Sequence, residues 1–385
     1  MEKPITYGMV GGDVKAFIGE VHRKALSFDP RVKLVAGAFS IVPELHQLTA
    51  ETYDIPLERR YDDYQQMAEK ESKRKDPIDF VIVCTPNALH YEVCRTFLLQ
   101  GINVVCEKPL SFTPEEGEEL VRLAKEKNLL FAVNYSYVGY LMVKIAKEMI
   151  QRGEIGEILS ANAEYLQDWL LDAADPKTAK EAVRTIWRLN PKMSGSSCCL
   201  GDIGTHCENM LHYLLGETPD RLFCESENYS QQLDLSAVVH LHFPSGIKAS
   251  VIVSQVALGH ENDFTVRIWG TQGSLEWHQQ QPDYLYFTKR GERSEILTRG
   301  SSYLRGYEAS QRLRRLPAGH PEGFYEAFAN NYQAIVTSLI LRRNGETLSP
   351  ASEDYPHGED GLEGVRFATS AVASNAEKCW VEMKQ

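Results

Sequence analysis

The sequence predicts an α/β chain of two domains, a doubly wound parallel sheet followed by an α+β domain with an open, mostly antiparallel sheet. Its 385 residues exceed the length at which a single hydrophobic core stops growing. Strand and helix patterns alternate over residues 1–135, which is typical of parallel βαβ units. Residues 136–385 instead contain closely spaced segments in which apolar and polar residues alternate. We therefore place the domain boundary at residue 135.

The strands expected in the first domain are short apolar runs. Phe80–Cys84, with sequence FVIVC, is apolar throughout, as expected of a strand covered on both faces. Thr113 and Pro114 begin a helix with a capping residue and a proline at the first position, and Gly101 ends the helix before it. The expected strands are Ile5–Val10, Val32–Phe39, Phe80–Cys84, Asn103–Cys106 and Leu130–Val133. The expected helices before Thr113 are Ile18–Phe28, Pro43–Tyr53, Tyr64–Lys73 and His90–Gln100.

The second domain begins with a helix over Tyr140–Arg152 and a longer strand over Glu157–Trp169. The strands after these have the period-two alternation of a half-buried antiparallel sheet, and three helices are expected to cover one face of it. These strands are Leu222–Tyr229, Ala237–Phe243, Lys248–Val256, Phe264–Gly270, Ser274–His278 and Tyr284–Thr288. The helices are Asp202–Leu215, Gly323–Arg343 and Gly361–Glu377.

Composition argues against two classes of partner. The net charge is −12 and the basic runs, Lys73–Lys75 and Arg312–Arg315, are short, whereas a nucleic-acid site needs clustered cations. No window approaches the ~18–20 apolar residues that a membrane span needs. The N-terminus has no basic segment followed by a long apolar stretch. We therefore expect a cytoplasmic protein that binds neither nucleic acid nor membranes.

The eight cysteines are scattered and suggest neither a disulfide framework nor a metal site. The adjacent Cys198-Cys199 and the neighbouring His206-Cys207 have no second ligand pair at zinc-site spacing. We expect no bound metal. Buried free thiols are the better interpretation, most clearly for Cys84, Cys94 and Cys106, which lie in apolar periodic segments.

A glycine turn joins the first strand to the first helix. Gly11 and Gly12 follow the strand, and Phe17 and Ile18 begin the helix, where backbone N–H groups and the positive helix end could meet a pyrophosphate. The spacing departs from G-x-G-x-x-G, because several residues separate Gly12 from Gly19. A glycine turn between a strand and a helix can form without any ligand. The prediction that this turn binds a dinucleotide therefore depends on its position at the start of a doubly wound pattern.

Polar residues also follow the second and third strands. Ser40 stands where a dinucleotide fold usually offers an acidic residue to the ribose diol, and no Arg stands beside it to hold a 2′-phosphate. This favours NAD over NADP. Thr85, Asn87 and His90 follow the third strand, at the edge where ligands bind. Ser40 and Asn87 have an alternative role as helix caps.

Two further segments suggest acid–base chemistry. Glu107-Lys108 follows a buried strand directly, and two charges there are costly unless they face a cleft or pair with each other. Asp202 and His206 are four residues apart at the start of a helix and therefore share one face. A His beside an acid that orients its ring can take a hydroxyl proton. The alternatives are a surface ion pair and an ordinary helix cap by Asp202.

Together four segments resemble the glucose-fructose oxidoreductase and inositol dehydrogenase family, Gfo/Idh/MocA. They are V-G-G at 10–12, T-P-N-x-x-H at 85–90, E-K-P at 107–109 and G-D-I-G-T-H at 201–206. The resemblance implies a Rossmann domain that binds NAD, with NADP as the alternative, and a C-terminal sheet that mediates a homo-oligomer. It implies that His206 is the base, Asp202 its electrostatic partner and Lys108 a hydroxyl-positioning donor. The expected cofactor contacts are Gly11, Gly12, Phe17, Ile18, Ser40, Thr85, Asn87, His90, Glu107 and Lys108.

Further segments resemble a glucoside 3-dehydrogenase-like branch of this family. They are the loop of residues 11–23, the segments 165–169 and 187–188, and the turn 319–323. The chain departs from that branch at Asp13 and Lys15, where glycine is usual, and this puts the phosphate contacts in doubt. The branch implies a sugar or glycoside site. Its candidates are Tyr135, Tyr137, Gln167, Asp168, Trp169, Trp187, Arg188 and His320, although aromatic residues in strands often belong to the core.

Three functions compete. The first is NAD-dependent oxidation of a ring hydroxyl of a sugar or glycoside, with the glucosyl C3 hydroxyl as a candidate, giving a keto-sugar. The second is an oxidoreductive glycosidase that recycles NAD through oxidation, elimination and reduction, with Tyr137 or His320 as the extra base. The third is a non-catalytic nucleotide-sensing protein on the same fold. An intact set of Lys108, Asp202 and His206 favours catalysis.

Overall fold

The computed structural model describes residues 3–383, which divide into two compact units. The N-terminal unit contains residues 3–136 and 328–362, and the C-terminal unit contains residues 137–327 and 363–383. The first change of unit falls one residue from the boundary expected at 135. The grouping of 328–362 with the N-terminal residues is not part of that expectation. Each unit is described below by itself.

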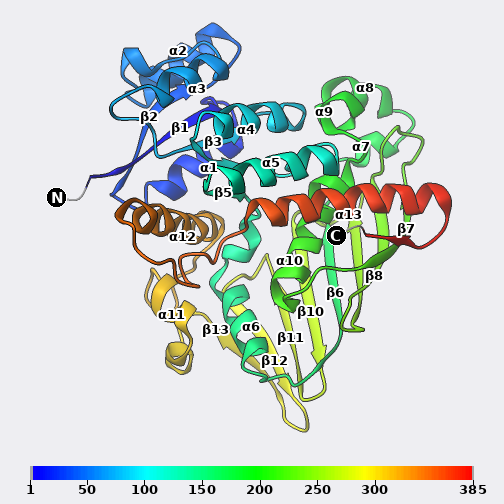
Figure 1. Ribbon diagram of the computed structural model, residues 1–385. Helices are drawn as coiled ribbons and strands as arrows, with labels where there is room; N and C mark the ends of the chain where they lie inside the picture. The colour runs from blue at the N-terminus through cyan, green and yellow to red at the C-terminus, as the bar shows by residue number, and fades with distance from the viewer. Residues whose placement is uncertain (1–2, 384–385) are drawn as a thin grey trace. The chain divides into compact units, whose positions relative to one another are not determined.

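The N-terminal unit contains a five-stranded parallel sheet in the order β2-β1-β3-β4-β5 (Figure 1). All five predicted strands are present, and β3 is buried along its whole length, as its apolar sequence predicts. The strand order reverses between β1 and β3, and ligands of doubly wound folds bind beside such a point, at the carboxyl ends of the strands. The strands are β1 Ile5–Gly11, β2 Val32–Ala38, β3 Phe80–Cys84, β4 Asn103–Cys106 and β5 Phe131–Val133.

The helices of this unit start and end where the capping signals indicate. The Thr113 hydroxyl accepts the backbone N–H of Glu116, and the Glu116 carboxylate accepts that of Thr113, which completes a capping box. Gly101, after the fourth of these helices, has a φ of +78°. The helices are α1 Phe17–Leu26, α2 Pro43–Thr52, α3 Tyr64–Ser72, α4 His90–Leu99 and α5 Pro114–Glu126, with 3₁₀ turns η1 Leu57–Arg59 and η2 Asn87–Leu89.

Helix α12, Phe324–Asn344, departs from its prediction. It was expected to cover the antiparallel sheet, but from Phe328 onward it belongs to the N-terminal unit. The Phe328 ring lies 5.3 Å from His22 of α1, and the Tyr332 ring lies 6.5 Å from Phe80 of β3. These aromatic contacts bring a helix from late in the sequence against the parallel sheet.

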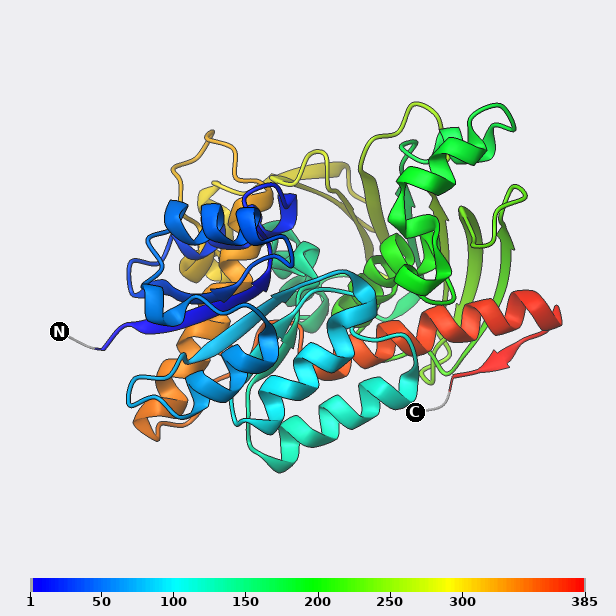
Figure 2. The same cartoon turned by 90° about the horizontal axis from the view of Figure 1, so that it is seen from above.

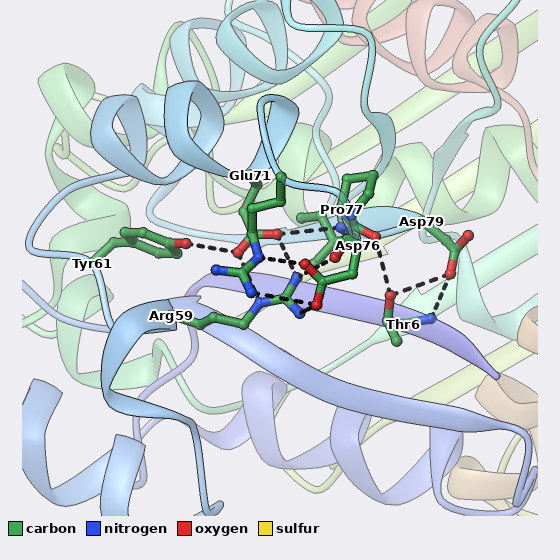
Figure 3. Close-up of polar contacts among 9 residues, drawn as sticks. Thr6, Arg59, Tyr61, Glu71, Asp76, Pro77 and Asp79 are labelled. Atoms are coloured by element: carbon green, nitrogen blue, oxygen red, sulfur yellow. Dashed lines mark hydrogen bonds and ion pairs between the residues drawn. The ribbon is translucent and has the colours of Figure 1, made fainter. Parts of the chain in front are cut away.

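A buried ion pair ties α3 to the segment before it (Figure 3). The Glu71 carboxylate has no exposed surface and accepts hydrogen bonds from Arg59 Nε at 3.0 Å, Tyr61 Oη at 2.7 Å and the Ile78 backbone N–H at 3.3 Å. Arg59 Nη2 donates to its second oxygen. Tyr61 also donates its backbone N–H to the Gly37 carbonyl of β2. This network therefore holds one edge of the parallel sheet.

The C-terminal unit contains a nine-stranded sheet in the order β13-β12-β11-β10-β6-β9-β8-β7-β14. Neighbouring strands are antiparallel except β6 and β9, so the prediction of a mostly antiparallel sheet is confirmed. The last two strands were not predicted. The strands are β6 Ile158–Leu166, β7 Arg221–Glu227, β8 Ser236–His242, β9 Lys248–Ser254, β10 Asp263–Gly270, β11 Gly273–His278, β12 Tyr284–Lys289, β13 Ser294–Thr298 and β14 Val381–Glu382.

Strand β6 ends at Leu166, three residues before the predicted end at Trp169. Gln167 still donates its backbone N–H to Ser254, the last residue of β9. The chain then turns, because the Leu171 N–H bonds to the Asp168 carbonyl. The polar and aromatic residues of this segment therefore lie in a turn at the end of the strand.

Helices cover one face of the nine-stranded sheet, as predicted for this unit. They are α6 Leu141–Gln151, α10 Thr205–Leu215 and the part of α13, Gly358–Glu377, that follows Leu362. Figures 1 and 2 show α13 in red, followed by β14 at the edge of the sheet. On the strands, buried side chains such as Val239 and Val251 alternate with more exposed ones such as Val238 and Ile252. The sheet thus has one covered face and one open face.

Short helices between β6 and β7 were not predicted. They enclose a small apolar cluster of their own that includes Leu170, Leu189 and Leu235. In Figure 2 this segment is the green group of short helices at the upper right. None of the helices described is long and apolar enough to cross a membrane. The remaining short elements are η3 Ser136–Gly139, α7 Leu171–Ala174, α8 Ala179–Thr185, η4 Trp187–Leu189, α9 Pro191–Ser194, η5 Leu200–Gly204, η6 Ser302–Gly306 and α11 Glu308–Leu313.

Candidate active site

The glycine turn after β1 is a tight cradle. Gly11 and Gly12 have φ of +76° and +69°, a region that favours glycine. A Cβ on Gly11 would come within 2.7 Å of the Cys84 carbonyl oxygen of β3. A Cβ on Gly19 of α1 would come within 2.5 Å of the Gly12 Cα. Despite its unusual spacing, the turn packs helix against strand as closely as a dinucleotide fold requires.

The start of α1 is open to an anion. Its N-cap residue, Ala16, supplies no side-chain acceptor, whereas first-turn N–H groups of helices need partners from outside the helix. The unexpected Asp13 is used locally, since its carboxylate accepts the Lys15 backbone N–H at 2.9 Å. Phe17 at the helix start is 69% exposed. The Asp13 carboxylate therefore closes its own turn, and Lys15 is exposed beside it.

Ser40 lies just beyond β2. Its hydroxyl accepts the Val42 backbone N–H at 3.3 Å, but α2 has no side-chain cap, so its alternative role as the cap of that helix is wrong. Ile41 beside it is 96% exposed. Sequence analysis did not single out this exposed isoleucine.

The turn after β3 lies next to the glycine cradle, because Gly11 and Cys84 are paired in the sheet. The Thr85 hydroxyl oxygen is buried and makes no hydrogen bond within residues 3–383. Asn87 begins the turn η2 and does not cap α4, so that alternative is also wrong. His90 is buried, and its ring nitrogens lie 3.0 Å from the Thr85 carbonyl and 2.6 Å from the Pro109 carbonyl. The His90 ring therefore links the segments that follow β3 and β4. The cofactor contact expected of His90 stays a prediction.

Glu107 lies in a buried polar network behind Lys108. His22 Nε2 lies 2.9 Å from the Glu107 carboxylate, Asn134 Nδ2 donates to the same oxygen, and His22 Nδ1 lies 2.6 Å from Tyr332 Oη. Burial alone would raise the pKa of Glu107. The hydrogen bond and charge of His22, with Lys108 and Asn134, hold it below its ordinary value.

This network decides against a simple surface pair between Glu107 and Lys108. Glu107 is 8% exposed and directs its carboxylate to His22 and Asn134, while Lys108 is partly exposed. The cofactor contact expected of Glu107 stays a prediction. Tyr135 is 1% exposed, so its expected role as a stacking surface for sugar is wrong. Sequence analysis missed His22, Asn134 and Tyr332, which lie far apart in the chain.

In the C-terminal unit, Asp202 lies in the π-helical turn η5, immediately before α10. The sequence predicted one continuous helix here. Asp234, from the loop before β8, caps the turn: its carboxylate accepts the backbone N–H of Cys198 at 3.0 Å and of Leu200 at 2.7 Å. Burial raises the pKa of Asp234, and these hydrogen bonds oppose the rise. Asp202 is therefore not the cap, and π-turns often occur at functional sites.

The Asp202 carboxylate is held by side chains. Gln255 Nε2 donates to its Oδ2 at 2.8 Å, and Arg188 Nε lies 3.4 Å from the same oxygen. Gln255 follows β9 directly and has no exposed surface. It was missed although it is a polar residue just after an apolar strand, the same signal that identified Thr85 and Glu107.

His206, on α10, is 7% exposed and lies among tyrosines. Its ring is 4.7 Å from that of Tyr137 and 6.3 Å from that of Tyr165, which are joined by a 2.6 Å hydrogen bond between their hydroxyls. Tyr137 also packs against Phe264. Tyr137 is 8% exposed and packs in the core, and the substrate contact expected of it stays a prediction. Its ring also packs against that of His206.

The turn after β6 continues this network. Gln167 Nε2 donates to Asn262 Oδ1 at 2.6 Å, and Gln167 Oε1 accepts from Trp169 Nε1 at 2.9 Å. Tyr165 Oη donates to Asn262 as well, at 3.0 Å. Asp168 accepts the Gly259 backbone N–H at 3.1 Å. The structure thus brings Gln167 and Trp169 together with Asp202 through Gln255, while Asp168 anchors a neighbouring loop.

Arg188 connects two half-exposed indoles to Asp202. Its guanidinium carbon lies 4.5 Å from the Trp187 ring and 5.8 Å from the Trp169 ring, which are 37% and 41% exposed. Cations attract such ring faces. His320 is exposed, and the buried Arg299 donates to its carbonyl. No described contact joins the His320 ring to this cluster, so its place in a substrate site stays a prediction.

Two family models match the chain. The oxidoreductase family model, described as an NAD-binding Rossmann fold, matches residues 5–135, and the GFO/IDH/MocA C-terminal domain model matches residues 143–276. An uncharacterised oxidoreductase of Bacillus subtilis is 32% identical, over 100% of this chain and 98% of that protein. The chain belongs to the Gfo/Idh/MocA oxidoreductase family.

Other relatives agree over the full length. Levoglucosan dehydrogenase of Pseudarthrobacter phenanthrenivorans is 27% identical, over 99% of this chain and 98% of that enzyme. The crystal structure of an inositol dehydrogenase homologue of Azotobacter vinelandii in complex with NAD⁺ matches with a TM-score of 0.91 and 33% identity, over 99% and 98% of the two chains. As a Gfo/Idh/MocA protein, this chain is an NAD-binding oxidoreductase.

The N-terminal unit fits that cofactor. The Gly12–Gly19 contact leaves no room for a Cβ, as a pyrophosphate-binding turn requires, and α1 begins without a side-chain cap. The buried Thr85 hydroxyl at the strand reversal has an unused donor and acceptor. Gly11, Gly12, Thr85 and the first turn of α1 would hold the dinucleotide.

Proposed function

We propose that this Gfo/Idh/MocA protein oxidises a ring hydroxyl of a sugar or glycoside with NAD, with the glucosyl C3 hydroxyl as the target and a keto-sugar as the product. One observation carries the proposal. The Asp202 carboxylate, four residues before His206, is held by the side chains of Gln255 and Arg188 and does not cap a helix. A partly exposed carboxylate that is held in place four residues before a histidine is an arrangement for proton removal.

The proposed roles are those of an acid–base set. His206 takes the proton from the substrate hydroxyl oxygen. Asp202 stabilises the imidazolium that results, and Lys108 donates a hydrogen bond to the same hydroxyl. NAD, when bound, accepts the hydride that leaves the carbinol carbon. Tyr137 keeps the His206 ring from turning, because it packs against the ring edge to face at 75°.

Two features favour a sugar or glycoside as the substrate. The residues around Asp202 combine the partly exposed guanidinium of Arg188 with the half-exposed rings of Trp169 and Trp187. Sugar rings offer hydroxyls at their edges and C–H groups on their faces, and such a surface suits both. The relatives named levoglucosan dehydrogenase and inositol dehydrogenase homologue support the same class of substrate.

The test is NADH formation, followed by absorbance, with a matched panel of methyl glucosides, aryl glucosides, free monosaccharides and inositols. We expect stoichiometric NADH with at least one glucoside, and NMR of the product should show a carbonyl at C3. A carbonyl at another carbon would support the dehydrogenase activity and show that a hydroxyl other than the one at C3 is oxidised. Absence of NADH with every member of the panel would contradict the proposal.

The same panel separates the competing functions. Release of the aglycone with substoichiometric NAD, and no net NADH, would identify the oxidoreductive glycosidase. Calorimetric NAD binding without turnover of any compound would identify a nucleotide-sensing protein. The reaction should run with NAD in preference to NADP, because Ser40 offers no cation to a 2′-phosphate.

We also propose that the chain forms a homo-oligomer through the open face of its nine-stranded sheet. Val238 and Ile296 on this sheet are 40% and 54% exposed, and a second copy would cover them. Light scattering after size exclusion tests this, and Val238→Lys should shift the mass toward the monomer if the face is the interface.

The buried thiols of Cys84 and Cys106 fit a cytoplasmic protein, where thiols stay reduced.

A further inference from the structure

We propose that Gln255 is a positioning residue for Asp202: its side-chain amide holds the carboxylate in one orientation for its work with His206. This inference rests on the proposed function and deepens it, because it names what makes Asp202 effective. It concerns the C-terminal unit alone. Gln255 was not among the expected site residues, and it makes no contact with substrate in the proposed mechanism.

Both ends of the Gln255 residue are fixed. Its backbone N–H donates to the Leu235 carbonyl at 2.9 Å, and its carbonyl accepts the Leu170 N–H at 3.0 Å. The side chain has no exposed surface. Because the Gln255 side chain is already ordered, it loses little conformational entropy when it donates a hydrogen bond to Asp202. Little of the free energy of that hydrogen bond is therefore lost.

The direction of each hydrogen bond around Gln255 follows from groups that have only one role. The Trp169 indole N–H can only donate, and it donates to Gln167 Oε1. That oxygen therefore also accepts from Gln255, whose Nε2 lies 3.3 Å away. The ionised Asp202 carboxylate can only accept, and it lies 2.8 Å from the same nitrogen. Both neighbours thus require Gln255 to present its NH₂ group.

The contact at the opposite end of the amide is compatible with this orientation. Cys198 Sγ lies 3.6 Å from Gln255 Oε1 and donates its S–H to that oxygen. Gln167 cannot turn to compensate, because its own Nε2 donates to Asn262. A flip of Gln255 would set an oxygen against the Asp202 carboxylate and against Gln167 Oε1. The network therefore keeps one amide orientation.

The charged and titratable groups around Asp202 come from several elements. Arg188 approaches from η4, Gln255 from the end of β9, and Cys198 precedes the π-turn. Tyr165 of β6 lies in the same network, and its pKa is raised by burial and then by Tyr137 and Asp202. Among the contacts described for the Asp202 carboxylate, Arg188 is partly exposed and Gln255 is not. Of these two contacts, the one from the neutral amide is therefore the better shielded from solvent.

Two substitutions of nearly the same size as Gln255 separate positioning from packing. Gln255→Met removes the N–H donors and should lower kcat by about tenfold at every pH, because Asp202 loses a hydrogen bond to a charged group. Gln255→Glu presents a donor only while the new carboxyl is protonated. Its kcat should fall as pH rises and the new carboxyl ionises against Asp202, giving a descending limb that the wild type lacks.

The matched control is Gln231→Met in the same unit. Gln231 Nε2 donates to the Ala173 carbonyl at 2.7 Å, and no side-chain hydrogen bond described for it reaches a residue of the site. This variant should keep the kcat and the pH profile of the wild type. If Gln255→Met and Gln255→Glu lower the thermal midpoint but leave kcat and the shape of the profile unchanged, Gln255 is only structural and the inference is overturned.

A second pair of variants applies if neither Gln255 variant folds. Cys198→Ala removes the S–H donor that fixes the amide, and we expect a loss of about threefold in kcat, within the range for a single neutral hydrogen bond. Cys198→Ser keeps a donor and should restore the wild-type value. Equal kcat in Cys198→Ala and wild type would overturn the inference.

The wild type is measured first, so the two proposals fail in different ways. A wild type that forms no NADH with any sugar, glycoside or inositol overturns the proposed function and this inference with it. A wild type that turns over, alongside Gln255 variants with unchanged kcat and pH profile, overturns the role of Gln255 alone.

Discussion

Glu71 in the N-terminal unit and Asp202 in the C-terminal unit are both acidic residues held by an arginine and by neutral donors, but the two arrangements differ in their surroundings. Glu71 has no exposed surface and faces Arg59, Tyr61 and a backbone N–H, all of which belong to the scaffold. Asp202 is partly exposed and faces Gln255 and Arg188. The first carboxylate is closed off from any ligand, whereas the second keeps a side toward solvent.

This difference teaches how to separate a structural from a functional carboxylate. A fully buried, fully hydrogen-bonded ion pair resists removal of either partner, because the other charge would be left without compensation. A partly exposed carboxylate beside a histidine can stabilise a charge that appears during a reaction. Glu107 lies between these cases, since it is buried but adjoins Lys108, which is partly exposed.

The largest effect should come from the acid–base pair itself. Asp202→Asn and His206→Ala should each lower kcat/KM by about 10²–10⁴-fold, the usual contribution of general acid–base catalysis, which corresponds to about 3–5 kcal/mol. Steady-state kinetics with the best glucoside measures this. Thermal melting should show little change for Asp202→Asn, because Asp234 and not Asp202 caps the turn. Activity above a tenth of the wild type in both variants would remove Asp202 and His206 from the mechanism.

Glu71 should show the reverse pattern. Glu71→Gln removes the closer of two carboxylates that pair with the 7% exposed Arg59 and leaves Asp76 at 3.5 Å, and we expect a loss of about 3 kcal/mol in the free energy of unfolding. Urea unfolding at 25 °C measures this loss. The kcat of the folded enzyme should stay within about twofold of the wild type, because Glu71 bonds only to scaffold groups. A lower kcat without a loss of stability would contradict the structural role assigned to Glu71.

Glu107 predicts an effect that depends on pH. Its folded-state pKa is depressed, so its contribution to stability is present above the unfolded value, about 4.3, and is lost as pH falls through the folded value. The unfolding free energy of the wild type should exceed that of Glu107→Gln by about 1–3 kcal/mol at pH 7, the range for hydrogen bonds to a charged group. The difference should shrink below pH 4. Urea titrations from pH 7 to 3.5 test this.

The opposite trend would contradict the network. A difference between wild type and Glu107→Gln that grows toward low pH would mean that burial and not His22 dominates the pKa of Glu107. His22→Gln should mimic part of the effect, because it removes the imidazole that lies 2.9 Å from the carboxylate. Its thermal midpoint should therefore lie between those of wild type and Glu107→Gln at neutral pH.

Local patterns predicted much of the fold and part of the site. The strand Phe80–Cys84, the capping box at Thr113 and the glycine turn are determined within a few residues of sequence, so propensity and periodicity identify them. Lys108 was found because a charge directly after a buried strand is unusual. Asp202 and His206 were found because their spacing places them on one helix face, and the family resemblance gave all three their roles. Whether the three act on one substrate stays a prediction.

What the sequence could not predict depends on distant partners. Gln255 is 53 positions from Asp202, and Tyr332 is 310 positions from His22. No local pattern links such pairs. For the same reason Asp234 was missed as the cap of the π-turn, a role for which Asp202 was only the alternative, and α12 was assigned to the wrong sheet. The burial of Tyr135 could not be predicted either, because it depends on packing against residues far away in the sequence.

The smallest effect on stability is expected at Glu69, an exposed neighbour of Glu71. Glu69 lies on α3, two residues before Glu71, and pairs with Lys73 at 2.6 Å while both side chains are more than 60% exposed. The hydrogen bond and charge of Lys73 lower the pKa of Glu69, but solvent and salt screen this exposed pair. Glu69→Gln should leave the urea midpoint at physiological salt unchanged within error, alongside the large loss for Glu71→Gln. Equal losses in the two variants would show that the charge balance of α3, and not burial of the Arg59–Glu71 pair, stabilises this edge of the sheet.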